Sequence, residues 1–515
     1  MTPEEELVQR TRAAHAAVED GGRTEAVERQ HRAGKLTARE RVALLATDGF
    51  AEFGALAGPG PAQPGGAPMV APGDGVVTGI ARIDGRPAAV AAFDFTVLGG
   101  SNGVVGMAKV ERCVERALVD RIPLVLLCDG GGHRMQEGLD SRHAAPGSQL
   151  LQRLVDLSGL VPTVSVILGP GFGVGANLSA LCDLVVMVRG MGLLGMSSAP
   201  FVLAGTGESL TNEEIGGADV QARHGIADLA VDDEQEALDA VRAYLSFLPA
   251  HAEGEVLRLK GPHRSCDVDI DRLVPADGQV AYDVLEVVEA LADADSVLEL
   301  RPSAAPNVVT SLARIGGHPL GVVANQPLHL AGALDSAACE KAAHFVAVCD
   351  AFGLPLLLLI DLPGFLIGTP AESTQLARRS GRLMFELGRA TVPRFTIVTR
   401  KGYGAAYVAV GGGRSVDADL SLAWPTAEIC AMPIDGAVDI AYRRQVEAAD
   451  DPASERAQLI ARFRANVDPL LAAAGFGIDD VVVPADTRGI LIEALSRARR
   501  RPERVAGKRR AISPI

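Results

Sequence analysis

The sequence predicts an α/β protein built from two similar domains, each with a largely parallel sheet. The chain has 515 residues, which is more than one hydrophobic core usually organises and suits two domains of roughly 250 residues. Similar segments recur in the same order in the two halves. Short apolar runs alternate with helical patterns, which is typical of parallel sheets covered on both faces.

The internal repeat is visible in three pairs of segments, at offsets of 231 or 232 residues. The pairs are GVVTGIARIDGRPAAV (75–90) with NVVTSLARIGGHPLGV (307–322), IPLVLLCD (122–129) with LPLLLLID (354–361), and VPTVSVILGPGFGVGAN (161–177) with VPRFTIVTRKGYGAAYV (392–408). Three blocks in one order indicate a duplicated domain.

Each half therefore has the same expected order of elements. A hairpin comes first, with its turn at Asp84 and Gly85 in the first half, and a helix follows at about 106–120 or 336–352. A short apolar strand then ends in Asp129 or Asp361. After a loop and another helix, a second apolar strand leads through a glycine-rich turn into a helix. We expect domains at 1–255 and 270–515, because helical and strand periodicity is lost near 250–280, and a surface loop at 54–75.

The composition excludes several classes of function. A net charge of -15 disfavours nucleic acid as a partner. Residues 157–182 carry no charge, but the prolines and glycines in their middle favour a buried strand, a turn and a helix over a membrane span. The acidic start MTPEEELVQR predicts no secretory signal. Seven scattered cysteines without a CxxC predict no zinc site and no disulfide framework, so we expect no metal and a cytoplasmic location.

Two equivalent turns are the candidate chemical sites. GPGFGVGA (169–176) and RKGYGAAY (400–407) each follow a buried strand and open a helix. Small residues let a ligand approach the backbone, and free amides at a helix N-terminus suit a developing oxyanion. Tight helix–strand packing would explain either turn alone, but their repetition at matching positions favours a function in polarising two carbonyl groups.

A third glycine turn, GGGHRMQEG (130–138), follows the strand that ends at Asp129. Gly131, Gly132, His133 and Arg134 could contact phosphates or an acidic substrate group there, and a purely structural turn is an equal alternative. The sequence has no GxxxxGK[ST] phosphate loop and no GxSxG nucleophile elbow.

These segments resemble the carboxyltransferase (β) subunits of acyl-CoA carboxylases, such as that of propionyl-CoA carboxylase. The resemblance runs from about residue 30 to residue 502. The matching segments are RQHRAGKLTARERVALL (29–45), FDFTVLGGS (93–101), GGGHRMQEG (130–138), NEEIGGA (212–218), CDAFGLPLLLLIDLPGFLIGT (349–369), RATVPRFTIVTRKGYGAAY (389–407) and AWPTAE (423–428).

The resemblance implies two tandem crotonase-like domains and a biotin-dependent carboxyltransferase. Such an enzyme passes CO2 from carboxybiotin to the α-carbon of an acyl-CoA through a thioester enolate, so coenzyme A is part of the substrate. It also implies a hexamer, whose active sites lie between the N-terminal domain of one subunit and the C-terminal domain of its partner. None of the six lysines lies in a Met-Lys-Met setting, so biotin is expected on a separate carrier protein loaded by a biotin carboxylase.

Carried over to this sequence, the resemblance assigns oxyanion-hole roles to the two turns. Gly173 and Val174 would bind the thioester oxygen, and Ala405 and Ala406 the ureido oxygen of biotin. The remaining candidate substrate-binding residues are Gly131, Gly132, His133, Arg134, Gly171, Phe172, Gly175, Tyr403, Gly404, Tyr407 and Val408.

The sequence departs from the family pattern at several of these positions. Val174 and Ala405 stand where glycine is usual, and Val408 stands where aspartate is common. An apolar residue at 408 suggests a larger or more apolar acyl group. Two alternatives to carboxylation are therefore a biotin-independent derivative, which decarboxylates or forms bonds on a thioester, and a non-catalytic paralogue within a carboxylase complex.

Overall fold

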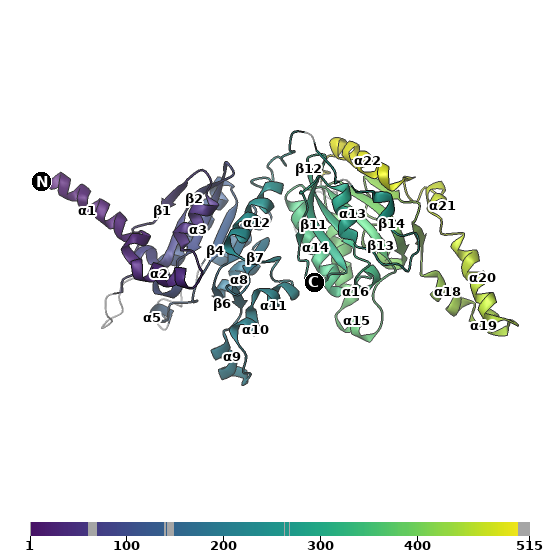
Figure 1. The fold of residues 1–515 in the computed structure, drawn as a ribbon, viewed down its shortest axis with the longest axis horizontal. Coiled ribbons are helices and arrows are strands. Elements are labelled where there is room, and N and C mark those ends of the chain that lie inside the picture. Colours follow the sequence, from purple (N-terminus) through teal and green to yellow (C-terminus); the bar gives the residue numbers. More distant parts are fainter. Residues whose placement is uncertain are drawn as a thin grey trace. The chain divides into compact units, whose positions relative to one another are not determined.

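Each half of the chain builds one mainly parallel sheet covered by helices, as the computed structural model in Figure 1 shows. The structure describes residues 2–59, 69–138, 141, 149–261, 263–266 and 268–502. The chain divides into two compact units, Met1–Gly254 and Glu255–Ile515, and each unit holds one of the two large sheets.

The sheet of the first unit has seven strands in the order β1-β2-β3-β4-β5-β7-β9. The pairs β1–β2 and β2–β3 are antiparallel, and every pair from β3–β4 onward is parallel. Their bounds are β1 Phe50–Phe53, β2 Val76–Ile83, β3 Arg86–Phe93, β4 Leu124–Cys128, β5 Thr163–Ile167, β7 Leu184–Val188 and β9 Leu229–Val231, and a separate parallel pair is formed by β6 Pro170–Phe172 and β8 Leu193–Gly195. Ile83 pairs with Arg86, which confirms the predicted hairpin turn.

The sheet of the second unit has the order β10-β11-β12-β13-β14-β15-β17, and β16 pairs with the end of β14. Its bounds are β10 Leu298–Leu300, β11 Val308–Ile315, β12 His318–Asn325, β13 Leu356–Leu362, β14 Arg394–Tyr403, β15 Leu420–Ala423, β16 Glu428–Cys430 and β17 Asp480–Val481. The strand order repeats that of the first unit, which confirms the predicted duplication. The strand β14 continues without a break where the first unit has the two strands β5 and β6.

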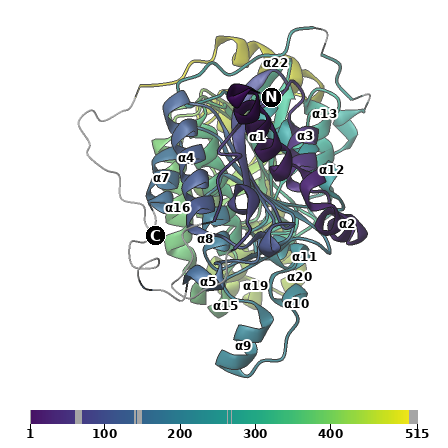
Figure 2. The same ribbon diagram turned by 90° about the vertical axis from the view of Figure 1, so that its left-hand side faces the viewer.

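Helices cover both faces of the first sheet. The helices α4 (Val104–Asp120) and α7 (Leu150–Leu157) lie on one face, and α3 (Ala38–Leu45) and α12 (Glu234–Phe247) on the other, as Figure 2 shows. The helix α4 buries positions three or four residues apart, among them Val110, Cys113, Val114 and Ala117, because this spacing forms one apolar stripe.

The second sheet is covered in the same way. The helices α14 (Ser336–Ala351) and α16 (Leu376–Arg389) pack against one face, and α13 (Val284–Leu291) and α22 (Pro484–Arg497) against the other. The hydrophobic core between the sheet and the helices α13 and α22 includes Leu357, Phe395 and Trp424.

The remaining helices connect or extend these layers. In the first unit they are α1 Pro3–Val18, α2 Thr24–Arg32, α5 Met135–Gly138, α8 Val174–Ala180, α9 Ala199–Thr206, α10 Asn212–Gly216 and α11 Ala218–Arg223. In the second they are α15 Thr369–Ser373, α17 Gly404–Ala409, α18 Ile434–Ala441, α19 Arg443–Ala448, α20 Pro452–Arg464 and α21 Pro469–Ala474. In Figure 1, α1 and α9 extend from the body of the first unit and α18 to α20 from that of the second. The helices α1 and α9 bury no residue within this chain.

The uncharged segment 157–182 forms the end of α7, the strands β5 and β6, and the helix α8, as its glycines and prolines predicted. In the part of the chain that the structure describes, no helix is long and apolar enough to cross a membrane.

Candidate active site

The first turn leads from β6 into α8 through a backbone conformation that requires glycine. Gly173 has φ 67 and ψ -123, which lies outside the regions open to residues with a side chain. No atom would lie within 4 Å of a Cβ added there, so the backbone angles, and not a lack of space, demand glycine.

The amides of this turn are divided between internal bonds and free donors. The Gly173 amide donates to the Gly195 carbonyl at 3.0 Å, and the amides of Ala176 and Asn177 donate to the Gly173 carbonyl at 3.0 and 3.3 Å. The amides of Val174 and Gly175 have no acceptor among the described residues, because they belong to the first turn of α8. These two amides, and not that of Gly173, are the free donors.

This arrangement corrects the sequence analysis by one residue. Gly173 was expected to supply an oxyanion donor together with Val174, but its amide is used by the β6–β8 pair. The donor pair is Val174 and Gly175. Val174 is 52% exposed, so the turn lies at the surface of the unit.

The second turn has the same design. Gly404 follows β14 with φ 66, and the amides of Ala405 and Ala406 lie in the first turn of α17 without an acceptor among the described residues. At the repeat offset of 231, Gly404 corresponds to Gly173, so Ala405 and Ala406 correspond to Val174 and Gly175. Val174 and Gly175 are therefore the equivalents of Ala405 and Ala406, the pair expected in the second half.

The glycine turn after β4 lies beside the first turn. The Gly130 amide donates to the Pro170 carbonyl at 3.0 Å, and the Gly131 amide to the Gly99 carbonyl at 2.9 Å. A Cβ added to Gly132 would lie 4.0 Å from the Phe172 carbonyl oxygen. Loops after three neighbouring parallel strands thus meet at one edge of the sheet, where ligands bind in many α/β proteins.

Arg134 has a structural position in this turn. Its side chain is 1% exposed and forms ion pairs with Asp74 at 2.5 Å and Glu137 at 2.9 Å. These carboxylates also accept amides at the start of α4, from Gly106 and Val104 respectively. The guanidinium therefore faces protein carboxylates, and the structural interpretation of the turn holds for Arg134. His133 is exposed at the tip of the turn and remains a candidate contact for substrate.

The other candidate residues take different positions around the turns. Gly171 is buried within β6, and the Phe172 ring packs near Gly195. In the second unit, the Tyr403 hydroxyl donates to Glu428, and burial, with this carboxylate, raises the pKa of Tyr403 far above its usual range. The Tyr407 ring packs against Gly402 and Gly412, and burial raises its pKa to about 12. Val408 is 48% exposed, so its side chain is open to a ligand.

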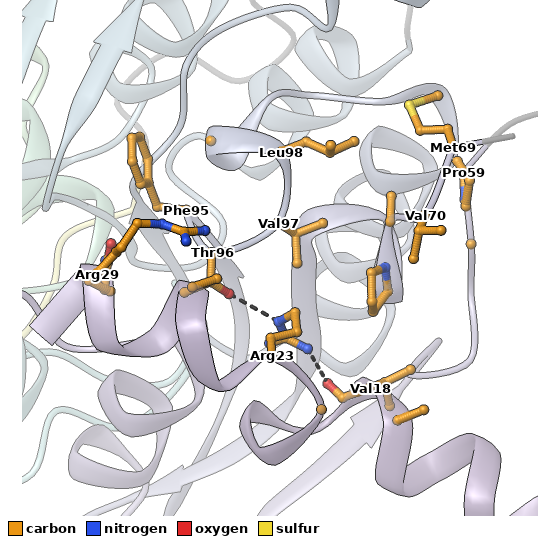
Figure 3. Close-up of a pocket in the computed structure, with 18 of the residues that line it drawn as sticks. Val18, Arg23, Arg29, Pro59, Met69, Val70, Phe95, Thr96, Val97 and Leu98 are labelled. Carbon is orange, nitrogen blue, oxygen red and sulfur yellow. Dashed lines mark hydrogen bonds between the residues drawn. The ribbon is translucent and has the colours of Figure 1, made fainter. Parts of the chain in front are cut away.

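A large cavity opens beside the loop that follows β3, as Figure 3 shows. Its volume is about 1140 Å³, and its lining combines apolar residues such as Val70, Phe95 and Leu98 with the cations Arg23, Arg29 and Lys35. Arg23 and Lys35 are neutralised by Asp94 at 2.8 Å and Asp129 at 2.6 Å. Arg29 is exposed and forms no ion pair with a described residue, so it leaves one net positive charge at the wall.

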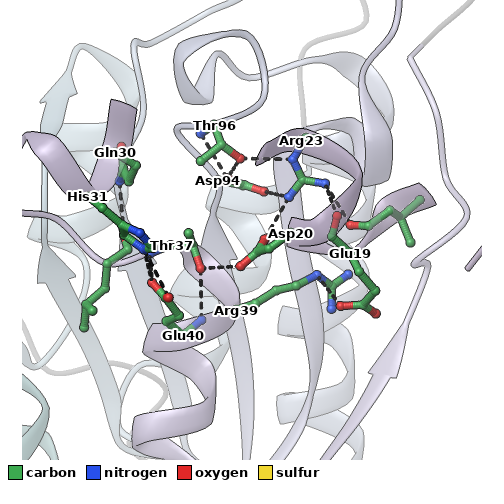
Figure 4. Close-up of polar contacts among 12 residues, drawn as sticks. Glu19, Asp20, Arg23, Gln30, His31, Thr37, Arg39, Glu40, Asp94 and Thr96 are labelled. Atoms are coloured by element: carbon green, nitrogen blue, oxygen red, sulfur yellow. Dashed lines mark hydrogen bonds and ion pairs between the residues drawn. The ribbon is translucent and has the colours of Figure 1, made fainter. Parts of the chain in front are cut away.

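Polar contacts hold the N-terminal helices in place around this cavity (Figure 4). Arg23 donates to both Asp94 and Thr96, and Thr37 donates to Asp20 at 2.6 Å. These contacts fix the segment that contains Arg29.

A second polar cluster anchors the same helices to the end of β4. Asp129 is fully buried and accepts from Lys35, Arg41 and Gln30. Burial lowers the pKa of Lys35 although Asp129 acts against this shift. Gln30, Lys35 and Arg41 lie in the segment 29–45 that resembles the family, but nothing in the sequence indicates that they meet at Asp129.

The described residues contain no cluster of three His, Cys, Asp or Glu side chains that could hold a metal ion. All seven cysteines are free, and burial raises the pKa of most of them.

Comparison with known proteins places the chain in a family. Residues 29–512 match the carboxyl transferase domain family. The propionyl-CoA carboxylase carboxyltransferase subunit of Haloferax mediterranei is 38% identical over 501 residues, which cover 96% of each chain. The methylmalonyl-CoA carboxyltransferase 12S subunit of Propionibacterium freudenreichii subsp. shermanii is 38% identical and covers 93% of this chain and 91% of that one.

Solved structures agree with this match. A transcarboxylase 12S crystal structure, a hexamer with methylmalonyl-coenzyme A and methylmalonic acid bound, superposes with a TM-score of 0.93 at 36% identity and covers 100% of this chain and 99% of that one. A single-chain, multi-domain long-chain acyl-CoA carboxylase gives a TM-score of 0.82 at 33% identity over 96% of this chain and 49% of that one. The chain therefore belongs to the carboxyl transferase domain family and is a carboxyltransferase of the biotin-dependent acyl-CoA carboxylase type, with the two crotonase-like domains that the resemblance implied.

Proposed function

We propose that the chain transfers CO2 from carboxybiotin to the α-carbon of an acyl-CoA through a thioester enolate. The observation that carries this proposal is the pair of equivalent turns, each with two amides at the start of a helix that have no acceptor among the described residues. Donors aimed at a developing oxyanion stabilise the transition state more than the ground-state carbonyl. Two such turns suit a reaction in which two carbonyl oxygens gain negative charge.

In this proposal the two units divide the substrates. The domain at 1–255 holds the acyl-CoA, whose thioester oxygen accepts from the amides of Val174 and Gly175. The domain at 270–515 holds biotin, whose ureido oxygen accepts from the amides of Ala405 and Ala406. Carboxybiotin supplies the CO2, and the ureido nitrogen that its departure exposes takes the α-proton of the acyl-CoA. The first pair of amides then stabilises the enolate while its α-carbon bonds to CO2, so the route requires no side-chain base.

The cavity of the first unit is the proposed site for the nucleotide end of the acyl-CoA. Its loop, Phe95 to Gly99, is hydrogen-bonded to the turn at Gly131, and that turn lies beside Phe172 and the first pair of amides. An apolar wall suits a base, and the unneutralised charge of Arg29 suits a phosphate.

The partners follow from the same reaction. We propose that a separate chain carries biotin, that a biotin carboxylase loads it, and that the protein forms a hexamer like the solved transcarboxylase 12S assembly. Each site would then combine the first unit of one copy with the second unit of another. The free cysteines fit a reducing cytoplasm. The exposed, apolar Val408 favours an acyl group longer or more apolar than that of acetyl-CoA.

Reconstitution tests the proposed function. The purified protein is mixed with a biotin carboxylase, a biotinylated carrier, ATP, labelled bicarbonate and acyl-CoAs of increasing chain length. We expect label in a carboxylated acyl-CoA only when the carrier is biotinylated. Label fixed into none of the acyl-CoAs, or fixed equally with an unbiotinylated carrier, would contradict the proposal.

A further inference from the structure

A hydrogen bond joins the second turn to the strand beside it. Tyr403 is the last residue of β14 and directly precedes Gly404, and its hydroxyl donates to the Glu428 carboxylate on β16. The Tyr403 ring is buried, and β16 pairs in parallel with the end of β14, so Tyr403 lies opposite Cys430. The contact thus spans the two strands at the point where the chain bends into α17.

The duplication provides an internal comparison for this contact. In the first unit β6 pairs with β8 in the same register, and Phe172 occupies the position of Tyr403. Pro170 pairs with Leu193 as Lys401 pairs with Glu428, so Leu193 occupies the position of Glu428. The same backbone therefore carries an apolar pair beside the first turn and a hydroxyl–carboxylate pair beside the second. Packing alone requires neither polar group.

The carboxylate of Glu428 also faces the helices α18 and α20. Arg464, at the end of α20, approaches its second oxygen at 3.8 Å and Asp435 on α18 at 3.7 Å. The Ile429 amide donates to the Val467 carbonyl at 3.2 Å, just beyond α20. A Cβ added to Gly404 would lie 3.4 Å from the Ala431 carbonyl. The second turn is therefore held against β16 and the helices that follow it.

We infer that Tyr403 and Glu428 are positioning residues, which fix the turn so that the amides of Ala405 and Ala406 meet the ureido oxygen of biotin. This inference rests on the proposed function of the second turn. A hydrogen bond to a carboxylate is stronger and more directional than a neutral one, so it restricts the strand end from which the turn begins. The first turn, which has no such bond, would not be affected by losing this pair.

The test is a double-mutant cycle in the reconstituted enzyme. Tyr403→Phe removes only the hydroxyl, and Phe172 shows that a phenylalanine fits this position. We expect the KM for the carboxylated carrier to rise, or kcat to fall, by about tenfold, because a hydrogen bond to a charged group contributes that much or more. The KM for acyl-CoA should stay unchanged. Glu428→Gln keeps an acceptor for the Tyr403 hydroxyl and should keep most of the wild-type activity. Glu428→Leu removes the acceptor and should resemble Tyr403→Phe.

The double variant Tyr403→Phe/Glu428→Leu should be no worse than either single variant, because both remove the same interaction. Thr396→Val is the matched control: its hydroxyl, also on β14, donates to the Gly411 carbonyl at 3.1 Å away from the turn. We expect this variant to lose stability without a selective change in the KM for the carrier.

Three outcomes would overturn the inference: wild-type kinetics in Tyr403→Phe, equal changes in the KM of both substrates, or fully additive losses in the cycle. Ala405→Pro, which removes an amide of the turn itself, distinguishes this failure from that of the proposed function. If Ala405→Pro is inactive while Tyr403→Phe behaves as wild type, only the positioning role is wrong. If folded Ala405→Pro is fully active, the second turn does not bind biotin and both ideas fail.

Discussion

At the scale of single residues, the charge of the cavity in the first unit depends on Arg29. Arg23 and Lys35 lie at the same wall, but each is paired with a buried carboxylate. Arg29 is therefore the lining cation most available to an anionic ligand. A cofactor with several phosphate groups would be attracted by this side chain at modest ionic strength.

We predict that Arg29→Glu raises the KM for acyl-CoA by about fivefold with little change in kcat, because reversing one exposed charge changes a binding free energy by about 1 kcal/mol. The effect should shrink as salt is added. Arg32→Glu is the control, because Arg32 is also exposed on α2 but does not line the cavity. If steady-state kinetics showed the same change in the KM for acyl-CoA in both variants, the cavity would not be the binding site of the acyl-CoA.

The free amides of the two turns show how far the sequence alone can identify single residues of the site. The repeat offset places Gly173 opposite Gly404, so aligning the halves strictly would have paired Val174 and Gly175 with Ala405 and Ala406. What the sequence could not show is the bond from Gly173 to Gly195, because β8 is only three residues long and has no pattern of its own. The sequence also left open whether Arg134 binds a ligand or has a structural role, because its partner Asp74 lies 60 residues away in the chain.

At the scale of elements, α4 and the glycine turn after β4 are joined by one buried cluster. Arg134 links Asp74 and Glu137, and both carboxylates accept amides from the first turn of α4. Negative side chains at a helix N-terminus are favourable, and the arginine offsets the cost of burying them. The cluster therefore ties a helix of the core to the loops at the candidate site.

We predict that Arg134→Met lowers the free energy of unfolding of the first unit by about 3–5 kcal/mol, because it leaves two buried carboxylates without their cation. The change is measured by the resistance of the first unit to trypsin as the urea concentration is raised. His133→Ala, at the exposed neighbouring position, should stay within about 0.5 kcal/mol of wild type. An Arg134→Met protein as stable as this control would show that the cluster does not anchor the turn.

Elements with a strong period were predictable, and short ones were not. The hairpins, the helices α4 and α14, and the strands β4 and β13 follow directly from the repeat. Even the buried amines of Lys109 and Lys341 recur at the offset of 232, and burial lowers the pKa of both to about 8. The edge strands β1 and β10, and the helices α9 and α18 to α20, escaped prediction because they are short or have no equivalent in the other half.

At the scale of the whole molecule, duplication explains why one chain can serve two substrates. Two units with the same strand order present the same kind of turn, and divergence has changed what surrounds each turn. Within its own unit, the first turn is joined through the glycine turn after β4 to the loop that lines a cavity of about 1140 Å³, and the second turn lies beside a hydroxyl–carboxylate pair. Family membership over residues 29–512 shows that this plan belongs to the entire chain and not to one half.

The most direct test of this account is the turnover of Val174→Pro and Ala405→Pro in the reconstituted enzyme, beside Val174→Ala and Ala405→Gly. Proline is tolerated in the first turn of a helix and removes only the amide donor, whereas the control variants keep it. The account predicts that each proline variant folds normally and loses about 100- to 1,000-fold in kcat, while each control stays near wild type. Wild-type turnover in either folded proline variant would contradict the claim that these amides hold the oxyanions.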